Sequence, residues 1–460
     1  MSPSTPSSEP SERVTKRPRL GSPPPRRSTL PYSLGMHLAP MVRIGTLPTR
    51  LVSLEYGATL VWGPEIVDKA IIGSTRTVNP RTGVVQFIKN NRSIFECHPL
   101  EKERLIFQLG SADPELAVKA LKVIEQDVAG VGLNCGCPKS FSLQGGMGAA
   151  LLKEPERLCN ILKALVNSTS LPIDAKIRLL PLPTPSPSSS NPSTDPSSST
   201  LSEEDPTLPL ILQILSTGIS CLTVHCRTQT MRSSEPALHN RLLSLTTSLS
   251  KIRQKELKTE LEEIASKVPI VCNGDVTGGT SNEEGQEEKG IDDELDSWGN
   301  FKQVCQETGV ESVMIARAAE SNPSCFNRKG LEDPIKVVIP KLLRIAILTG
   351  NHFSNTKYVL NAMNLHHSPT PPGKDLNRDI KLKMNKAKTN YEMGEIFGLE
   401  KGEVEDLQER GTREVLEGMV PRWRERRRRI LEKEGKGEKN TDVEEKEIVV
   451  EAKEVETGSK

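Results

Sequence analysis

The chain has 460 residues, enough for two or three domains built around one sizeable core. Apolar residues make up only 35% of the chain, so we expect part of it to remain unfolded. The formal charge of +1 excludes a global basic field that would attract nucleic acid, although it leaves room for a local basic patch.

The N-terminal segment, residues 1–33, is predicted to be a disordered tail rich in Ser and Pro. Its basic clusters at 16–19 and 26–27 are typical of nuclear-import signals, although a solvated basic tail explains them equally well. The segment lacks the apolar core of a signal peptide, and the nine cysteines of the chain lack the spacing of a secreted disulfide framework. We therefore expect a cytoplasmic protein, with a nuclear fraction as an alternative.

Eight short apolar runs follow, and most of them precede a helical pattern. The runs span residues 35–41, 58–62, 104–110, 131–137, 172–179, 221–227, 268–275 and 312–319. After the third run, Asp113 and Pro114 form a helix cap and first-turn pair. Strand–helix units repeated across residues 34–330 predict a (β/α)8 TIM barrel, an α/β fold. A doubly wound open sheet is the rival, but the first run is not followed by a Gly-x-Gly-x-x-Gly turn.

Other segments have different compositions. Residues 181–206 and 277–299 are of low complexity and are predicted to be loops inserted into the barrel. Residues 331–400 show helical patterns without strands, which indicates a small all-α domain. Residues 401–460 are dense in charge, including an Arg-rich run at 422–429, and are predicted to form a charged helix and a disordered tail. That run would be either a solvated helix face or an electrostatic contact for RNA.

Charged residues interrupt the fifth apolar run. Asp174, Lys176 and Arg178 alternate with apolar residues, and in a central parallel strand the charged face must point into the barrel. Buried charges are unfavourable unless they are paired. Lys176 and Arg178 therefore meet either an anionic ligand or an internal ion-pair network with Asp174.

Cysteines lie at the end of the fourth run, in the string Asn134-Cys135-Gly136-Cys137-Pro138. A cysteine at a strand end is usually a small buried residue, so Cys137 is either chemical or structural. The Cys-x-Cys spacing has no second pair in the sequence, and we predict no metal site.

The remaining strand ends suggest a phosphorylated ligand. His225 and Arg227 end the sixth run, and Gln108 ends the third, where it would reach the edge of a ring. The loops after the seventh and eighth strands of this fold commonly bind phosphate. Gly274 and Arg317 suit that task through backbone N–H groups and a forked guanidinium. FMN, a planar and phosphorylated cofactor, fits this description.

These positions, taken in order, resemble the tRNA-dihydrouridine synthases. The matching strings are Ala39-Pro40-Met41, Gln108, Asn134-x-Gly136-Cys137-Pro138, Lys176-x-Arg178, His225-x-Arg227, Asn273-Gly274-Asp275, Ala316-Arg317-Ala318 and, in the helical domain, Asn355-Thr356-Lys357-Tyr358. The strings at 38–48 and 134–152 resemble the eukaryotic branch that modifies uridine 20 of tRNA. Cys226 and Ala318 stand where the family often has Gly, but neither change removes a side-chain role.

The resemblance implies a reaction and its site residues. NADPH would reduce bound FMN, the flavin would reduce the C5=C6 bond of a uridine in the tRNA D-loop, and Cys137 would donate the proton. Asn134 and Arg178 would orient the uracil. The residues expected to hold the cofactor are Pro40, Met41, Val42, Glu65, Gln108, Lys176, His225, Asn273, Gly274, Asp275, Ala316 and Arg317.

The implied partner is tRNA, bound at its elbow by a monomer that has no membrane partner. The target uridine must leave the folded elbow, as bases modified by enzymes generally do. A positive surface would hold the RNA backbone. The candidates in the helical domain are Lys357, Lys381, Lys383, Lys386 and Lys388, although each alone is more typical of a solvated lysine.

Two alternatives remain open on the sequence. The first is an FMN-dependent TIM-barrel oxidoreductase that acts on a free small molecule. The second is a non-catalytic tRNA-binding chaperone. Salt-sensitive tRNA binding separates the enzyme that acts on tRNA from the first alternative. A colourless protein that FMN cannot reconstitute would favour the second.

Overall fold

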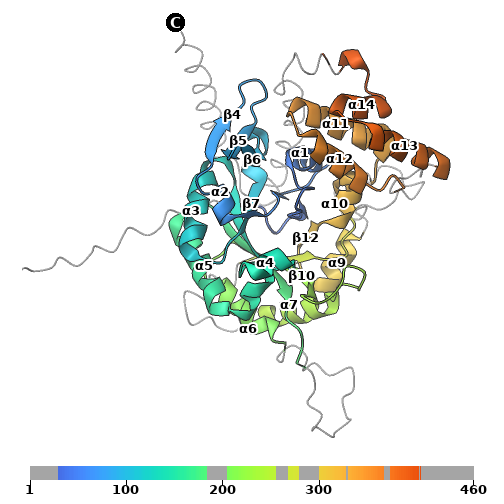
Figure 1. The fold of residues 1–460 in the computed structure, drawn as a ribbon. Coiled ribbons are helices and arrows are strands. Elements are labelled where there is room, and N and C mark those ends of the chain that lie inside the picture. The colour runs from blue at the N-terminus through green and yellow to red at the C-terminus, as the bar shows by residue number, and fades with distance from the viewer. Residues whose placement is uncertain are drawn as a thin grey trace, which may run out of the picture.

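A closed barrel forms the centre of the molecule (Figure 1). The computed structural model describes residues 30–183, 205–254, 268–278, 300–327, 330–366, 373–403 and 405. Eight parallel strands close the barrel within these ranges, because β1 pairs with both β12 and β2, and β2 pairs with β7. The TIM-barrel prediction is confirmed. The barrel strands are β1 (Gly35–Leu38), β2 (Val61–Trp62), β7 (Leu105–Gly110), β8 (Gly130–Cys135), β9 (Ile173–Leu179), β10 (Cys221–Thr228), β11 (Ile270–Asn273) and β12 (Ser312–Ile315).

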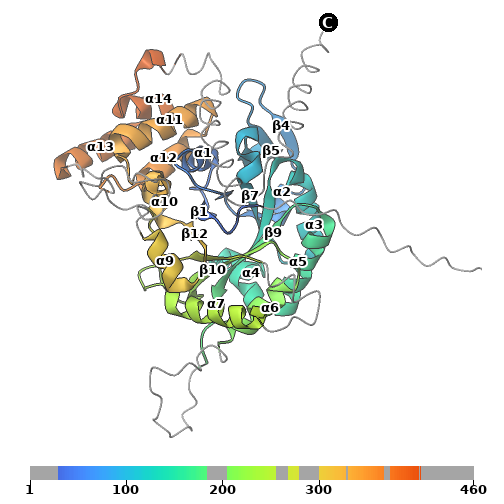
Figure 2. The ribbon, with the colours of Figure 1, turned by 180° about the vertical axis from the view of Figure 1, so that it is seen from behind.

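Helices surround the barrel on its outside (Figures 1 and 2). The first turn of α3 shows the predicted start, because the Asp113 side chain accepts a hydrogen bond from the Leu116 N–H and Pro114 occupies the first turn. The helices between the strands, and directly after the last one, are α1 (Leu47–Glu55), α3 (Pro114–Ile124), α4 (Ser140–Gln144), α5 (Pro155–Ser168), α6 (Thr207–Leu215), α7 (His239–Gln254), α9 (Phe301–Thr308) and α10 (Arg317–Ser321). The longer helices, such as α3 and α5, pack against the barrel through an apolar stripe of helical period.

A small antiparallel sheet stands between β2 and β7, and the sequence patterns did not predict it. A short strand and helix, β3 (Ile66–Val67) and α2 (Asp68–Ile71), lead into it. Its strands are β4 (Thr75–Val78), β5 (Val85–Lys89) and β6 (Arg92–Cys97). Phe95 of β6 meets Phe107 of β7 edge to face, with ring centres 5.0 Å apart. This aromatic contact anchors the sheet to the barrel.

The amino-terminal end of the barrel is sealed by aromatic residues around one carboxyl group. Asp174 accepts hydrogen bonds from the Tyr32 hydroxyl at 3.4 Å and from the Trp62 indole at 3.3 Å. Burial raises the pKa of Asp174 to about 7, although both donors oppose the shift. No ion pair joins Asp174 to Lys176 or Arg178 in the described structure, so the internal network considered from the sequence does not form.

The predicted helical region follows the barrel and packs beside α1 (Figures 1 and 2). The Lys341 ammonium pairs with Glu55 at 2.9 Å, and the Tyr56 hydroxyl donates to Glu332 at 2.7 Å. These contacts join the region to the first barrel helix. Its elements are the short π-helix η6 (Pro334–Val338), α11 (Ile339–Leu348), α12 (Phe353–Ala362), α13 (Lys374–Lys386) and α14 (Asn390–Ile396).

Several predictions fall wholly or largely outside the described residues. They concern the tail at 1–33, the inserts at 181–206 and 277–299, and the C-terminal segment with its Arg-rich run at 422–429. They stay predictions. Across the described ranges, no helix combines the length and apolar character that crossing a membrane requires.

Candidate active site

The strand register gathers the predicted polar residues at the carboxyl end of the barrel. Asn134 on β8 lies opposite Lys176 on β9, and Arg178 lies opposite His225 on β10. His225 in turn lies opposite Asn273 on β11. Carboxyl ends of parallel strands meet at one rim, so these side chains line one opening of the barrel, which we call the mouth.

Gln108 is a buried amide that has no hydrogen-bond partner among the described residues. Neither its oxygen nor its nitrogen meets a donor or acceptor among the described residues. Opposite it in the register lies Gly132, where an added Cβ would lie 2.6 Å from an Asp174 carboxylate oxygen and 3.0 Å from the Gln108 oxygen. Glycine thus makes space for both side chains. An unsatisfied buried amide costs about 1–3 kcal/mol, which points to a ligand that would satisfy it.

Glu65, between β2 and β3, shows the same pattern. Its Oε1 is buried without a partner in the described part of the chain, and a Cβ at Gly110 would lie 2.6 Å from that oxygen. Burial raises the pKa of Glu65, while Asn134 and Lys139 oppose the shift. The structure therefore places Glu65 at the mouth beside Asn134.

The Lys176 ammonium lies within a cluster of cations. Burial and then the neighbouring Arg178 charge lower the pKa of Lys176 to about 7. No hydrogen bond or ion pair links this ammonium to any residue in the described part of the chain. An enclosed cation without a protein anion is a candidate for binding an acceptor or anionic atom of a ligand.

Asn134 and Arg178 hold the loop that carries Cys137. The Asn134 side-chain oxygen accepts the backbone N–H groups of Gly136 and Cys137, both at 3.1 Å. The Arg178 guanidinium donates to the carbonyls of Gly136 at 3.0 Å and Thr228 at 2.9 Å. Both side chains, expected to orient a uracil, therefore also fix the backbone next to the cysteine.

Cys137 is partly exposed, whereas most other cysteines in the described ranges are buried. Its carbonyl accepts the Ala149 N–H at 3.0 Å, which folds the following loop back against it. Gly148 makes this possible with a φ of 59°, and a Cβ there would lie 2.6 Å from the Cys137 oxygen. The thiol also lies near enough to Lys176 and Arg178 to influence the pKa of each.

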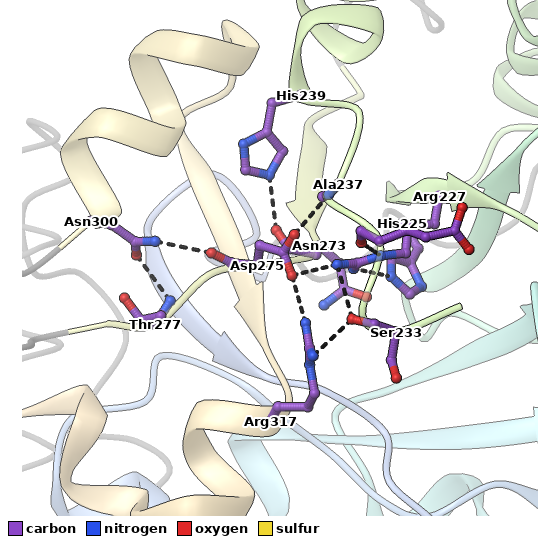
Figure 3. A network of polar contacts seen from close by, with 12 residues as sticks. His225, Arg227, Ser233, Ala237, His239, Asn273, Asp275, Thr277, Asn300 and Arg317 are labelled. Atoms are coloured by element: carbon purple, nitrogen blue, oxygen red, sulfur yellow. Dashed lines mark hydrogen bonds and ion pairs between the residues drawn. The ribbon is translucent and has the colours of Figure 1, made fainter. Parts of the chain in front are cut away.

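An arginine pair shares one carboxylate across β10, β11 and α10 (Figure 3). Asp275 Oδ1 accepts hydrogen bonds from Arg227 and Arg317, each at 2.5 Å, and Oδ2 accepts the Ala237 N–H at 2.7 Å. Arg317 also donates to the Ser233 carbonyl at 2.9 Å. Burial raises the pKa of Asp275, but the bonds from Arg227 and Ala237 outweigh it and lower the pKa overall.

His225 lies beside this pair and is neutral. Burial and then the charges of Lys176, Arg178 and Arg227 hold its pKa well below the usual range. Its Nε2 lies 3.4 Å from an Arg227 nitrogen, which suits an imidazole that accepts there. The sequence pattern predicts Arg227 at the same rim but assigns it no ligand. In the structure Arg227 links His225 to Asp275.

Gly274, next to Asp275, sets the backbone shape at the end of β11. Gly274 has a φ of 118°, and a Cβ there would come within 3.1 Å of Ala237 and 3.2 Å of His225. Asn273 is buried and donates to the Met314 carbonyl at 2.8 Å, which joins β11 to β12. Ala316 follows β12 directly and precedes Arg317 at the start of α10.

The residues after β1 lie on the loop that leads to α1. Pro40 and Met41 are partly buried, and Met41 packs against the core, whereas the Val42 side chain is 49% exposed. Met41 also accepts the Gly45 N–H through its carbonyl at 2.8 Å. The structure thus places an apolar loop at the carboxyl end of the first strand.

Lys357 is not at this mouth. Its ammonium donates to the carbonyls of Asn385 at 2.7 Å and Ala387 at 3.0 Å, so it ties α12 to the end of α13. The four other candidate lysines are exposed on and just after α13, where Lys383 pairs with Asp379 at 2.7 Å. The helical region thus offers a lysine-bearing surface, but Lys357 is a structural tie within it.

Comparisons with known proteins identify the family of this chain. A family model described as Dihydrouridine synthase (Dus) matches residues 37–181 and 199–368. The chain is similar to a Schizosaccharomyces pombe protein named tRNA-dihydrouridine(20) synthase (NAD(P)+), with 45% identity over 341 residues that cover 72% of this chain and 60% of that protein. A Saccharomyces cerevisiae protein of the same name is 35% identical over 347 residues, which cover 72% of this chain and 77% of that protein.

A more distant relative is the tRNA-dihydrouridine(20a/20b) synthase (NAD(P)+) of Schizosaccharomyces pombe. It is 27% identical over 290 residues, which cover 63% of this chain and 67% of that protein. The matched part spans about three fifths of the length of the first relative and about three quarters of the second. Because the family model covers more than half of the sequence, the chain belongs to the dihydrouridine synthase family.

Proposed function

We propose that this protein is a tRNA-dihydrouridine synthase that reduces the C5=C6 bond of a uridine in the tRNA D-loop. The proposed position is 20, which two relatives carry in their names. FMN is the proposed bound cofactor and NADPH the reductant. The observation that carries the proposal is that the Gln108 amide and the Lys176 ammonium lie inside the barrel that bears the Cys137 thiol, and neither has a partner among the described residues.

The residues present fit a flavin. Gln108 offers one donor and one acceptor to a ring edge, and Lys176 offers a donor to a ring carbonyl or nitrogen. Arg227 and Arg317 would hold the phosphate, and Gly274 leaves room for it to approach the backbone. When bound, the flavin supplies the hydride that reduces the uridine ring.

Cys137 supplies the proton in this proposal. Its backbone is fixed from one side by Asn134 and from the other by the contact of Arg178 with Gly136, so the thiol has a defined position at the mouth. Donation leaves a thiolate. Arg178, whose guanidinium holds the Gly136 carbonyl, lies beside the cysteine loop where this charge would form.

The exposed lysines of α13 would meet the tRNA backbone. The uridine is part of the folded elbow, so it must be turned out to reach a thiol at the barrel mouth. Contacts between α12 and the loop after β1 connect the helical region with that mouth. The proposal therefore assigns docking to the helices and chemistry to the strand ends.

The test is dihydrouridine itself, measured by mass spectrometry with position mapping. Unmodified tRNA is incubated with the purified full chain, FMN and NADPH. We expect dihydrouridine at position 20. Cys137→Ala should lose the product but keep its flavin spectrum, whereas Cys159→Ala on α5, outside the mouth, should keep both.

Other outcomes would decide against parts of the proposal. Dihydrouridine at another position would retain the activity and reject position 20. A yellow protein that oxidises NADPH without forming dihydrouridine, and binds tRNA no more tightly at low salt, would be an oxidoreductase for a small molecule. Loss of flavin together with activity in Cys137→Ala would make that cysteine structural.

A further inference from the structure

A second group of reactive side chains lies behind the mouth, on the other face of β10 and β11. Cys226 follows His225 in the chain, and Cys272 precedes Asn273, so both cysteines point away from the mouth. They lie in the apolar layer between the barrel and its helices, and both are fully buried. The site residues described above therefore do not include this group.

His239, at the start of α7, completes the group. One ligand atom from each of Cys226, His239 and Cys272 lies within 4.8 Å of the other two. In the described part of the chain, no other group of three or more Cys, His, Asp or Glu comes together in this way. Three elements that are distant in sequence thus converge on one point.

The two sulfur atoms are 3.7 Å apart. This distance is far beyond the roughly 2.05 Å of a disulfide bond. It matches two thiolates on one tetrahedral zinc ion, because zinc–sulfur bonds of about 2.3 Å place the sulfurs about 3.8 Å apart. The spacing thus fits zinc without movement of either strand.

Glu307 on α9 orients the histidine. Its Oε2 lies 3.1 Å from His239 Nδ1, while Nε2 lies 2.9 Å from the Gly274 carbonyl. A carboxylate on one ring nitrogen is the usual arrangement for a histidine that binds metal through the other. A metal at Nε2 would replace the proton that Nε2 now shares with Gly274, and the Gly274 carbonyl or a water would complete four ligands.

We propose that Cys226, Cys272 and His239 bind a zinc ion, with Glu307 as the residue that positions His239. Zinc takes thiolate and imidazole ligands in tetrahedral geometry, and its binding releases the two thiol protons and the Nε2 proton. The ion would tie β10, β11 and α7 together directly behind His225 and Gly274. No spacing motif in the sequence reveals this site, because its three ligands come from separate segments. The inference does not depend on the proposed reaction.

The experiment measures zinc per chain by elemental analysis. The full chain is produced in zinc-supplemented medium, freed of any histidine tag and dialysed without chelator. We expect about one zinc ion per chain. The Cys226→Ser/Cys272→Ser variant should contain none, whereas Cys159→Ser and Cys137→Ala should retain it, and the latter excludes the Cys-x-Cys pair as the site.

Glu307→Gln keeps the proposal testable if the double variant fails to fold, because Glu307 is a surface residue. Competition with a chelating dye should show zinc bound about tenfold more weakly in this variant. Cobalt in place of zinc should give the red-region bands of a tetrahedral thiolate site. A wild-type chain that binds neither added zinc nor cobalt, or a double serine variant that keeps its zinc, would overturn the proposal.

Discussion

The guanidinium of Arg43 lies over the ring of Tyr358, with 3.8 Å between its central carbon and the ring centre. Arg43 belongs to the loop after β1, and Tyr358 belongs to α12. The same loop is held by Asn355, whose side chain donates to the Arg43 carbonyl at 2.7 Å and accepts from Thr46 at 3.0 Å. Arg43 adopts a left-handed backbone with a φ of 68°. The loop is therefore shaped by its contact with the helical region.

Replacing Arg43 by Asn should uncouple tRNA binding from flavin chemistry. Asn accepts a left-handed φ, so the backbone is kept while the stacking contact, about 0.5–1 kcal/mol, is lost. We expect the KM for tRNA to rise about threefold, whereas NADPH oxidation without tRNA stays unchanged. Steady-state kinetics with and without tRNA measure both. A fall in NADPH oxidation would show that the loop serves the flavin instead.

Replacing Lys176 by Met should stabilise the flavin-free protein and weaken flavin binding. The pKa of Lys176 is lowered to about 7 from 10.5. Between these values the unfolded chain keeps a proton that the folded chain has lost, so wild-type stability rises with pH across this window. The melting temperature of Lys176→Met should thus exceed that of the wild type by a few degrees at pH 7, and the gain should shrink as the pH approaches 10.5.

Thermal unfolding of the flavin-free forms across this pH range checks the Lys176 prediction. Lys163→Met, at an exposed position of α5, is the matched control and should show no such trend. A gain that does not depend on pH would mean that Lys176 stays charged throughout and that Met merely packs better.

Replacing Gln108 by Met should also stabilise the flavin-free protein and weaken flavin binding, but the gain in stability should not depend on pH. Met has nearly the volume of Gln and removes two buried polar atoms that have no partner in the described structure. The flavin-free protein should gain about 1 kcal/mol of unfolding free energy, and the dissociation constant of FMN should rise about tenfold. Urea unfolding and flavin fluorescence give the two values. Unchanged FMN affinity would exclude Gln108 from the flavin site.

Replacing Asp275 by Asn should destabilise the flavin-free protein by about 1–2 kcal/mol, because Arg227 and Arg317 lose their shared charge. Asn tolerates the φ of 52° at this position, so the backbone is not the cause. The pKa of Asp275 is lowered from 3.8, so the extra unfolding free energy of the wild type is fully present above pH 3.8. This extra stability is lost only as the pH falls below 3.8.

Urea unfolding should therefore give the same difference in unfolding free energy between the wild type and Asp275→Asn at pH 7 and at pH 4.5. A difference that already shrinks between these two values would contradict a lowered pKa. It would assign the stabilisation to another group that titrates in that range.

The barrel was predictable because its strand ends carry polar residues within apolar runs, and the Asp113–Pro114 cap marks a helix start in sequence alone. The sheet formed by β4, β5 and β6 was not predictable, since the side chains of β4 are exposed and show no apolar alternation. The hydrogen-bond partners of the site side chains could not be predicted either. Asn134 and Arg178 bond to backbone groups of a loop whose fold depends on Gly148, and no local pattern shows such contacts.

Tyr32 closes the end of the barrel opposite the mouth. Its carbonyl accepts hydrogen bonds from His37 at 3.0 Å and Ser312 at 2.6 Å, and its hydroxyl reaches Asp174. The described chain therefore starts at the closed end, far from the strand ends that carry Cys137. A label or surface tether attached at the partly exposed Ser33, beside Tyr32, would leave the open end facing solution. This gives immobilised protein a defined orientation for measuring tRNA capture.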